Sequence, residues 1–418
     1  MDKKRKRTTE PGEQTRQIRH QSSVPNSTPD NSENWAEDFY HLLDLSSLSN
    51  HEDISDRFEA IAQALLHDFY FCFVADGTEN KFELLEAEFY LKSPEHDDPF
   101  THGSDEQKGA GRWYFHRTPR KAGAVSSAPI IPTAAGGYRG GTRKGLDLTI
   151  GRPLPPSVKS SRYFTQQNPS PAKDLSSGST SSALSSLSEM TGGVLLRSIR
   201  RLSDGNVSSG PSLLVDQLLR LGNASNVQDL VSNKWGGDIS VTVLAHDAPA
   251  PARTCLFLRK RPPPGTPSCS TPPTIYASPR IGLDLTNPAA QATPDSPRVA
   301  FVSRPYRFFI HPEKLTAYGR MQTFIGTCAF LAGGETRSEN AYGKELSAIS
   351  PKALEGACTL MALKLPSGQG YIEAFREGYE TMSLKTFVGA AGKNALRSTG
   401  YLAMVGAVQR SLEAKGET

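Results

Sequence analysis

The sequence predicts an α+β domain over residues 35–315, followed by a helical C-terminal extension at 316–418. Short runs in which apolar and polar residues alternate are typical of half-buried strands, and apolar residues at helical spacing indicate helices. The chain also contains 36 glycines, 30 prolines and long serine tracts. These tracts predict disordered low-complexity insertions at about 118–136, 152–190 and 261–298, and a disordered basic and polar tail at 1–34.

The first elements of the domain are a helix and a hairpin. The stretch 53–70 places apolar residues at helical spacing, namely Ile54, Phe58, Ile61 and Leu65. Two strands then flank a turn at Asp76-Gly77, which predicts a hairpin over 71–91. The segment "GRWYFHR" at 111–117 predicts a short aromatic strand, and ordered sequence resumes at 136–151.

The second half of the domain alternates strands with one helix. A strand is expected at 192–202, a helix at 211–221 opened by Gly-Pro-Ser, and further strands at about 239–245 and 253–259. The segment "PRVAFVSRPYRFFIH" at 297–311 resembles a last strand. From 316 onward the pattern is helical, and near the end one helix face carries Tyr401, Val405, Val408 and Leu412.

Composition limits the classes of function. The formal net charge of +4 is mildly basic and permits a nucleic-acid partner. The five cysteines are widely spaced, so neither a disulfide framework nor a zinc site is expected. No apolar run approaches the ~18 residues that a membrane-spanning helix needs. The basic run Lys3–Arg7 is typical of a nuclear import signal, so the expected location is the nucleus.

One strand of the hairpin has an unusual polar face. Side chains alternate across a strand, so Glu86, Glu88 and Tyr90 share one face of "LLEAEFYL". The simple interpretation is a half-buried strand whose polar face meets solvent. The alternative is a carboxylate and an aromatic ring that line a cleft, with His96 and His102 on the following loop.

That loop, "HDDPFTH", also has the composition of a metal site. His96, Asp97, Asp98 and His102 are close together and are of types that bind metals. However, they lie on one loop and no second cluster of ligands accompanies them, so a metallohydrolase is the weaker alternative and no metal site is expected.

The ordered segments, taken together, resemble a known family. Their order along the chain is E-A-E-F-Y-L at 86–91, T-H-G at 101–103, W-Y-F-H at 113–116, G-L-D-L-T at 145–149, V-L-L-R at 194–197, G-P-S at 210–212, V-Q-D-L at 227–230 and R-P-Y-R-F-F-I at 304–310. Once the insertions are skipped, this order is similar to that of the alkyladenine (3-methyladenine) DNA glycosylases. The resemblance identifies the chain as a divergent member with insertions and a C-terminal extension.

The resemblance implies a set of site residues. Glu88 takes the place of the catalytic base, and the positions of Tyr90, His102, Tyr114 and His116 imply stacking or pocket walls. Arg197 matches an arginine that serves the active site, and Asp147 stands where the family has an asparagine. In the family, the aromatic strand leads to a tyrosine that fills the space left in the duplex by the flipped base. Here the strand is interrupted after His116, so Tyr138 is the candidate for that residue. The basic loop with Tyr138, Arg139, Arg143 and Lys144 is expected to contact phosphates.

The family's chemistry explains these residue types. The damaged purine is flipped out of the duplex and stacked on aromatic rings, while a carboxylate activates the water that attacks the glycosidic bond. The resemblance therefore implies a curved, barrel-like antiparallel sheet flanked by helices that removes damaged purines from double-stranded DNA. No metal or organic cofactor is expected, and the protein is expected to be a monomer.

Two other classes of function remain open from the sequence. One is a non-catalytic nucleic-acid-binding module that has the same fold and an idle Glu88. The other is an interaction scaffold that uses the serine- and proline-rich insertions and binds protein partners through the C-terminal helices.

Overall fold

The computed structural model describes residues 35–101, 107–117, 143–153, 190–242, 254–262, 271–316, 318–333, 342–395 and 399–416. The basic tail at 1–34 and the predicted insertion at 118–136 lie outside these ranges, as does nearly all of the predicted insertion at 152–190.

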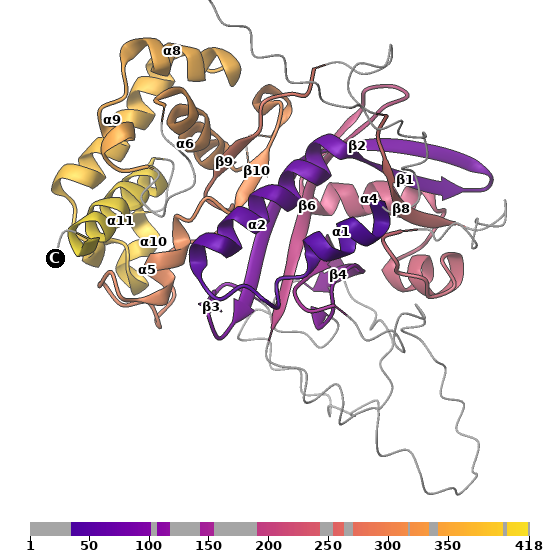
Figure 1. Ribbon diagram of the computed structural model, residues 1–418. Coiled ribbons are helices and arrows are strands. Elements are labelled where there is room, and N and C mark those ends of the chain that lie inside the picture. The colour runs from indigo at the N-terminus through magenta and orange to yellow at the C-terminus, as the bar shows by residue number, and fades with distance from the viewer. Residues whose placement is uncertain are drawn as a thin grey trace, which may run out of the picture.

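The strands form one curled antiparallel sheet, which confirms the α+β class and the curved sheet. Its main path runs β4–β5–β6–β2–β1–β8, and β10 and β3 also pair with β2, β9 with β10 and β7 with β6. The sheet curls into a half-barrel flanked by helices (Figure 1). The strands are β1 (Phe69–Ala75), β2 (Thr78–Ser93), β3 (His96–Asp97), β4 (Trp113–Arg117), β5 (Arg143–Ile150), β6 (Thr191–Arg201), β7 (Val207–Ser209), β8 (Cys255–Lys260), β9 (Tyr276–Ser278) and β10 (Arg307–Phe309).

The hairpin of β1 and β2 forms where its turn residues predict it. Asp76 and Gly77 both have positive φ, 47° and 73°, as a two-residue hairpin turn of the favoured twist requires. The second strand, β2, is long enough to pair with β1 near its start, with β6 along most of its length and with β10 at 86–88. Because of these pairings, β2 lies in the middle of the sheet and carries Glu88 there.

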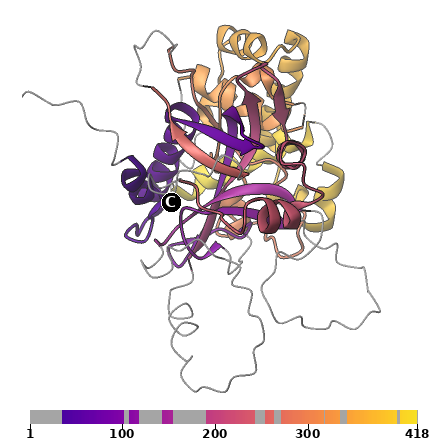
Figure 2. The ribbon, with the colours of Figure 1, turned by 90° about the vertical axis from the view of Figure 1, so that its right-hand side faces the viewer.

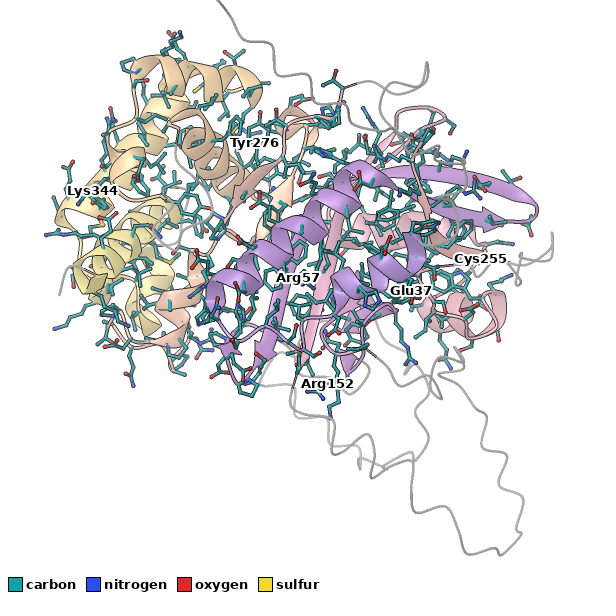
Figure 3. All side chains as sticks on the ribbon, viewed as in Figure 1. Glu37, Arg57, Arg152, Cys255, Tyr276 and Lys344 are labelled. Carbon is teal, nitrogen blue, oxygen red and sulfur yellow. The ribbon has the colours of Figure 1, made fainter. Side chains whose placement is uncertain are left out.

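Two N-terminal helices, α1 (Trp35–Leu43) and α2 (His51–Gln63), cover the apolar face of the sheet. Phe58 of α2 packs on Phe89 of β2 with 5.0 Å between ring centroids. Arg57 donates hydrogen bonds to backbone carbonyl groups at the end of α1, which join the two helices (Figure 3). A π-helical turn, Ala64–Asp68, continues α2 into β1, so the helix expected at 53–70 is present in two parts.

The helix α4 (Pro211–Leu221) has the bounds that the sequence predicts, with Pro211 in its first turn. Its apolar side packs against β5 and β6 through Leu214, Val215 and Leu218. A second π-helical turn follows at Asp229–Lys234. Of the strands expected at 239–245 and 253–259, the second is β8. The described part of the first is not a strand, although Ser240 forms an isolated bridge with Arg112 and the Val241 carbonyl accepts from the Leu258 N–H of β8.

The C-terminal helices gather at one side of the sheet, next to the start of α2, whose His51 ring lies 5.7 Å from the ring of Phe301 (Figures 1 and 2). They build a second hydrophobic core that also contains Leu285, Val299 and Val302, which precede the predicted boundary at 315/316. The helices are α5 (Pro297–Val302), α6 (Arg320–Leu331), α7 (Lys344–Ser347), α8 (Pro351–Leu360), α9 (Leu365–Thr381), α10 (Gly392–Ala395) and α11 (Gly400–Gly416), with short 3₁₀ turns at Pro312–Lys314, Leu384–Thr386 and Gly389–Ala391.

Two predictions for the region before 316 are wrong. The last strand-like run at 297–311 is half helix, because Pro297 begins α5 and only Arg307–Phe309 form β10. Within the predicted insertion at 261–298, residues 271–298 are ordered and contain β9, whose Ser278 is fully buried. These residues are ordered because they contact the sheet and α6, and local composition does not reveal such contacts.

Among the residues described, no helix combines the length and the hydropathy that crossing a membrane requires. Cys72, Cys328 and Cys358 are buried free thiols.

Candidate active site on the polar face of the sheet

One face of the sheet carries a row of side chains across five strands, and all but one of them are polar. Cross-strand pairing places successive members of the row opposite one another, and directly paired residues point to the same face. Four members, Tyr114, Asp147, Glu88 and Arg307, are buried, while Leu195 between Asp147 and Glu88 is partly exposed. The face is therefore accessible at Leu195. From β4 to β10 the row consists of Tyr114, Asp147, Leu195, Glu88 and Arg307.

Glu88 is 4% exposed, and protein groups bind both of its carboxylate oxygens. The guanidinium of Arg197 donates from Nη1 to Oε2 at 3.0 Å. The backbone N–H of Ile281 donates to Oε1 at 2.6 Å. These contacts hold the carboxylate in one orientation, because both donors belong to ordered backbone or to a buried side chain.

Glu86 forms a second buried cluster beside Glu88. Its Oε1 accepts from Arg197 at 3.1 Å and from Arg307 at 2.7 Å, and its Oε2 accepts from the Ser198 hydroxyl at 2.5 Å. Burial raises the pKa of Glu86, but Arg307, Arg197 and Ser198 outweigh it and hold that pKa below its usual value. The interpretation of Glu86 and Glu88 as solvent-facing strand residues is therefore wrong.

A bulge in the sheet allows one arginine to reach both carboxylates. The register between β2 and β6 skips Leu85 on one strand and Arg197 on the other. Such irregularities redirect a side chain and are common next to functional sites. Although burial disfavours its charge, Glu88 and Glu86 raise the pKa of Arg197 above its usual value. Arg197 therefore stays a cation between two carboxylates.

Asp147 forms a second group of polar contacts on the other side of Leu195. Its carboxylate is fully buried and accepts a hydrogen bond from the Tyr90 hydroxyl at 2.5 Å. Nδ1 of His116 lies 3.0 Å from each carboxylate oxygen. The side-chain amide of Gln107 donates to the Tyr90 oxygen at 2.7 Å. Burial and the neighbouring Asp147 raise the pKa of Tyr90 well above its usual value, so Tyr90 remains a phenol that donates its proton.

Two glycines make room for the rings of this group. The ring of His116 lies over Gly145, its cross-strand partner, where a Cβ would come within 2.2 Å of Cε1. The ring of Tyr90 lies in the same way over Gly193, where a Cβ would come within 2.4 Å of the hydroxyl oxygen. Any larger residue at either glycine would displace a ring from Asp147.

The structure thus brings together six of the residues expected at the site. Tyr114 is buried and pairs with Asp147 in the row. His102, Tyr138 and Arg139 lie outside the described residues, and for Arg143 and Lys144 the structure describes only their place at the start of β5. Those brought to the polar face are Glu88, Tyr90, Tyr114, His116, Asp147 and Arg197.

The loop at 96–98 does not provide a metal site in the described part of the chain. Nδ1 of His96 contacts the Leu91 carbonyl and Nε2 contacts the Tyr306 hydroxyl, each at 2.8 Å. Asp98 is fully buried and forms an ion pair with Arg280 at 2.7 Å. Burial lowers the pKa of His96 to about 4, so its ring is neutral near pH 7. No group of three potential ligands is present among the described residues.

A cavity of about 70 Å³ lies on the other side of β10, between that strand and α2. Ser55, Glu59 and Phe308 are among its lining residues, and none of the candidate site residues contributes to it. It is separate from the polar row.

Sequence reasoning missed three contributors to the polar face. Arg307, Ser278 and the N–H of Ile281 come from segments that were expected to be a plain strand and an insertion. A local signal was present for Arg307, because an arginine in the middle of the apolar run "YRFFI" needs a buried anion. No local signal identifies the Ile281 N–H.

Comparisons with known proteins add one distant relative. No family model matches the sequence. The chain is similar to "Uncharacterized protein L759" of Acanthamoeba polyphaga mimivirus, with 27% identity over 241 residues, which cover 56% of this chain and 84% of the viral protein.

Proposed function

We propose that this chain is a DNA glycosylase that removes damaged purines from duplex DNA by base flipping. One observation carries the proposal: a buried glutamate, Glu88, is held by Arg197 and by the Ile281 N–H next to the partly exposed Leu195. Aromatic groups, Tyr90 and Tyr114, lie on the same face. This is the combination that excision requires, a fixed carboxylate beside a surface on which a base can stack.

Each group has a role in the proposed reaction. The flipped purine rests against Leu195 and the aromatic rings, which exclude bulk water. Glu88 accepts a proton from the attacking water and stabilises the positive charge that develops on the sugar. Arg197 keeps the Glu88 carboxylate fixed. No step uses a metal or an organic cofactor.

A non-catalytic DNA-binding module remains the second candidate because both oxygens of Glu88 are already bonded within the protein. In that case Glu88 is part of a structural ion cluster. A carboxylate oxygen has more than one acceptor site, so the existing bonds leave room for a water. The two functions therefore differ in turnover and not in affinity for DNA.

The test is single-turnover incubation with duplexes that each carry one hypoxanthine, ethenoadenine or methylated purine, followed by alkali to cut abasic sites. Strand breaks are expected with the wild type and should fall at least about 100-fold in Glu88→Gln, as is usual for the loss of a general base. Glu83→Gln is the matched control, because Glu83 is also a buried glutamate of β2 but pairs with Arg200 and Arg261. DNA binding without breaks in any protein would favour the second candidate.

The proposal includes a nuclear location, which rests on the basic run Lys3–Arg7. Replacing that run by alanines should abolish nuclear accumulation of a fluorescent fusion of the full chain.

A further inference from the structure

A buried ion pair joins the loop after β2 to the segment that contacts Glu88. The carboxylate of Asp98 accepts from both terminal nitrogens of the Arg280 guanidinium, at 2.7 Å and 3.1 Å. Asp98 is fully buried and Arg280 is 4% exposed. The residue after Arg280 is Ile281, whose N–H donates to Glu88 at 2.6 Å. The pair is therefore one residue away from a contact of the proposed base.

The same arginine is attached to the backbone of β2. Nη1 of Arg280 donates to the carbonyl of Phe89, the residue after Glu88, at 3.3 Å. The guanidinium carbon also lies over the rings of Phe100 and Tyr306, 5.7 Å and 5.8 Å from their centroids, which is within the range of cation–π attraction. Two bonds to one carboxylate fix the orientation of a planar guanidinium. Arg280 is therefore held in place relative to the strand that carries the proposed base.

The carboxylate of the pair belongs to an ordered loop. The N–H of Asp98 donates to the His96 carbonyl at 2.9 Å, and the N–H of Phe100 donates to the Asp98 carboxylate at 3.0 Å. Nδ1 of His96 contacts the Leu91 carbonyl of β2. The loop that has the composition of a metal site thus provides a buried anion for an arginine, and that anion is anchored to the same strand as the proposed base.

The segment before Ile281 is anchored at both ends. At its start, the Ser278 hydroxyl accepts from Nη1 of Arg307 at 2.8 Å. At its end, Arg280 is bonded to the loop carboxylate. Pro279, between them, has its φ fixed by its ring. The segment therefore has little freedom, and the N–H that follows it is directed at one carboxylate oxygen of the proposed base.

We propose, on the basis of the glycosylase function above, that Asp98 and Arg280 are a positioning pair for the catalytic glutamate. Asp98 orients Arg280, and Arg280 places the N–H of Ile281. That N–H fixes Oε1 of Glu88, while Arg197 fixes Oε2. Both members of the pair act through other groups, so they are positioning residues and not catalytic residues. The pair matters for the rate because a displacement of about 1 Å from the productive geometry can cost about 100-fold.

The first test is Asp98→Asn, which keeps the shape of the side chain. The amide nitrogen of asparagine donates, and so does the guanidinium, so one of the two bonds is lost. Single-turnover rates are measured at saturating protein with the purine lesion that the wild type releases fastest. We expect the rate constant to fall about 10-fold or more, and the Kd for the duplex to change little. Glu83→Gln is the matched control and should keep the rate constant, because Glu83 is a buried glutamate of β2 that pairs with Arg200 and Arg261.

Two readouts separate positioning from folding. At saturating protein, the rate constant does not depend on the fraction of the protein that is folded, and circular dichroism reports that fraction. The second readout needs no DNA. It is the amide proton resonance of Ile281 in protein labelled with ¹⁵N-isoleucine, assigned by its loss in Ile281→Val. A short hydrogen bond to a carboxylate moves such a resonance downfield, so Asp98→Asn should move it upfield and Glu83→Gln should not.

Arg280→Lys is a second variant, for the case that Asp98→Asn does not fold. It keeps the buried positive charge, but an ammonium group cannot reproduce the planar, two-bonded contact with the carboxylate. The same fall in the rate constant and the same upfield shift are expected. If neither variant folds, the pair is required for the fold as a whole, and its assignment as a positioning pair is overturned.

The remaining outcomes separate this inference from the proposed function. A lower rate constant together with an upfield resonance supports the positioning pair. An unchanged rate constant in a folded variant, or a resonance that does not move, overturns the inference while the glycosylase function stands. A wild type that releases no base from any purine lesion overturns the glycosylase function and, with it, the role of the pair in catalysis.

Discussion

Replacement of Arg197 by methionine should show how the protein holds Glu88. Arg197 bonds to Glu88 at 3.0 Å and to Glu86 at 3.1 Å, and its side chain is only 6% exposed. After the replacement, Glu86 keeps Arg307 and Ser198, whereas Glu88 keeps the Ile281 N–H among the described contacts. Most of the cost therefore falls on Glu88. Leaving a buried charge without its partner costs about 3–5 kcal/mol of folding free energy.

A double-mutant cycle, measured by urea unfolding at pH 7, shows how much of the cost of Arg197→Met comes from the lost bond to Glu88. Glu88→Gln alone is expected to cost about 1–3 kcal/mol, because it removes the charge and keeps a group of the same shape. The free energy of unfolding of the double variant, Arg197→Met with Glu88→Gln, should be about 2 kcal/mol higher than the sum of the two single changes predicts. Arg200→Met is the control on the same strand. Its side chain is 26% exposed and its partner Glu83 also has Arg261, so we expect a loss of about 1 kcal/mol. A cost for Arg197→Met as small as that of the control, or strict additivity with Glu88→Gln, would show that Arg197 does not stabilise the Glu88 carboxylate.

Three further predictions concern the packing at the site, the pH dependence of stability and the packing of the C-terminal helices. Gly193→Ala should displace the Tyr90 ring from Asp147 and lower the free energy of unfolding, measured in urea, by about 1–3 kcal/mol. Gly205 has open space around it, so Gly205→Ala should cost only the strain of its positive φ. His96 has a pKa of about 4 in the fold, below its usual 6.5, so its contribution to stability is complete above pH 6.5 and is lost as the pH falls toward 4, by about 3 kcal/mol at most. His96→Gln should flatten that part of the stability curve, and an unchanged slope would contradict the assignment. Gly378→Ala places a Cβ within 2.0 Å of the Ala403 carbonyl oxygen, so it should separate α9 from α11. The C-terminal helices should then be cut faster in limited proteolysis. Gly370→Ala is the control, because a Cβ at Gly370 has no other atom within 4 Å and should not change the cutting rate.

Sequence patterns predicted the elements whose signals are local. The hairpin turn at Asp76-Gly77 and the helix opened by Pro211 depend on backbone preferences of a few adjacent residues, and both formed as expected. The strand-like run at 297–311 contained two signals against a single strand. These are Pro297, which is favoured in the first turn of a helix, and Pro305, which cannot donate to a strand.

The burial of the site could not be predicted in the same way because it depends on distant contacts. Glu88 is separated from Arg197 by 109 residues and Glu86 from Arg307 by 221. Alternation along β2 correctly placed Glu86, Glu88 and Tyr90 on one face, but it gave no information about what covers that face. Composition predicts an insertion around Ile281 because it reflects the local chain and not the sheet against which that segment packs.

The proposed role of Glu88 is that of a catalytic base and not only that of a member of an ion cluster. The most direct measurement is the release of free base, detected by mass spectrometry, from a duplex with one hypoxanthine at excess protein. We expect the wild type to release one base per duplex together with one abasic site, and Glu88→Gln to bind the duplex but release no base above background. Equal release by the wild type and Glu88→Gln, or binding without release by either protein for every purine lesion offered, would contradict it.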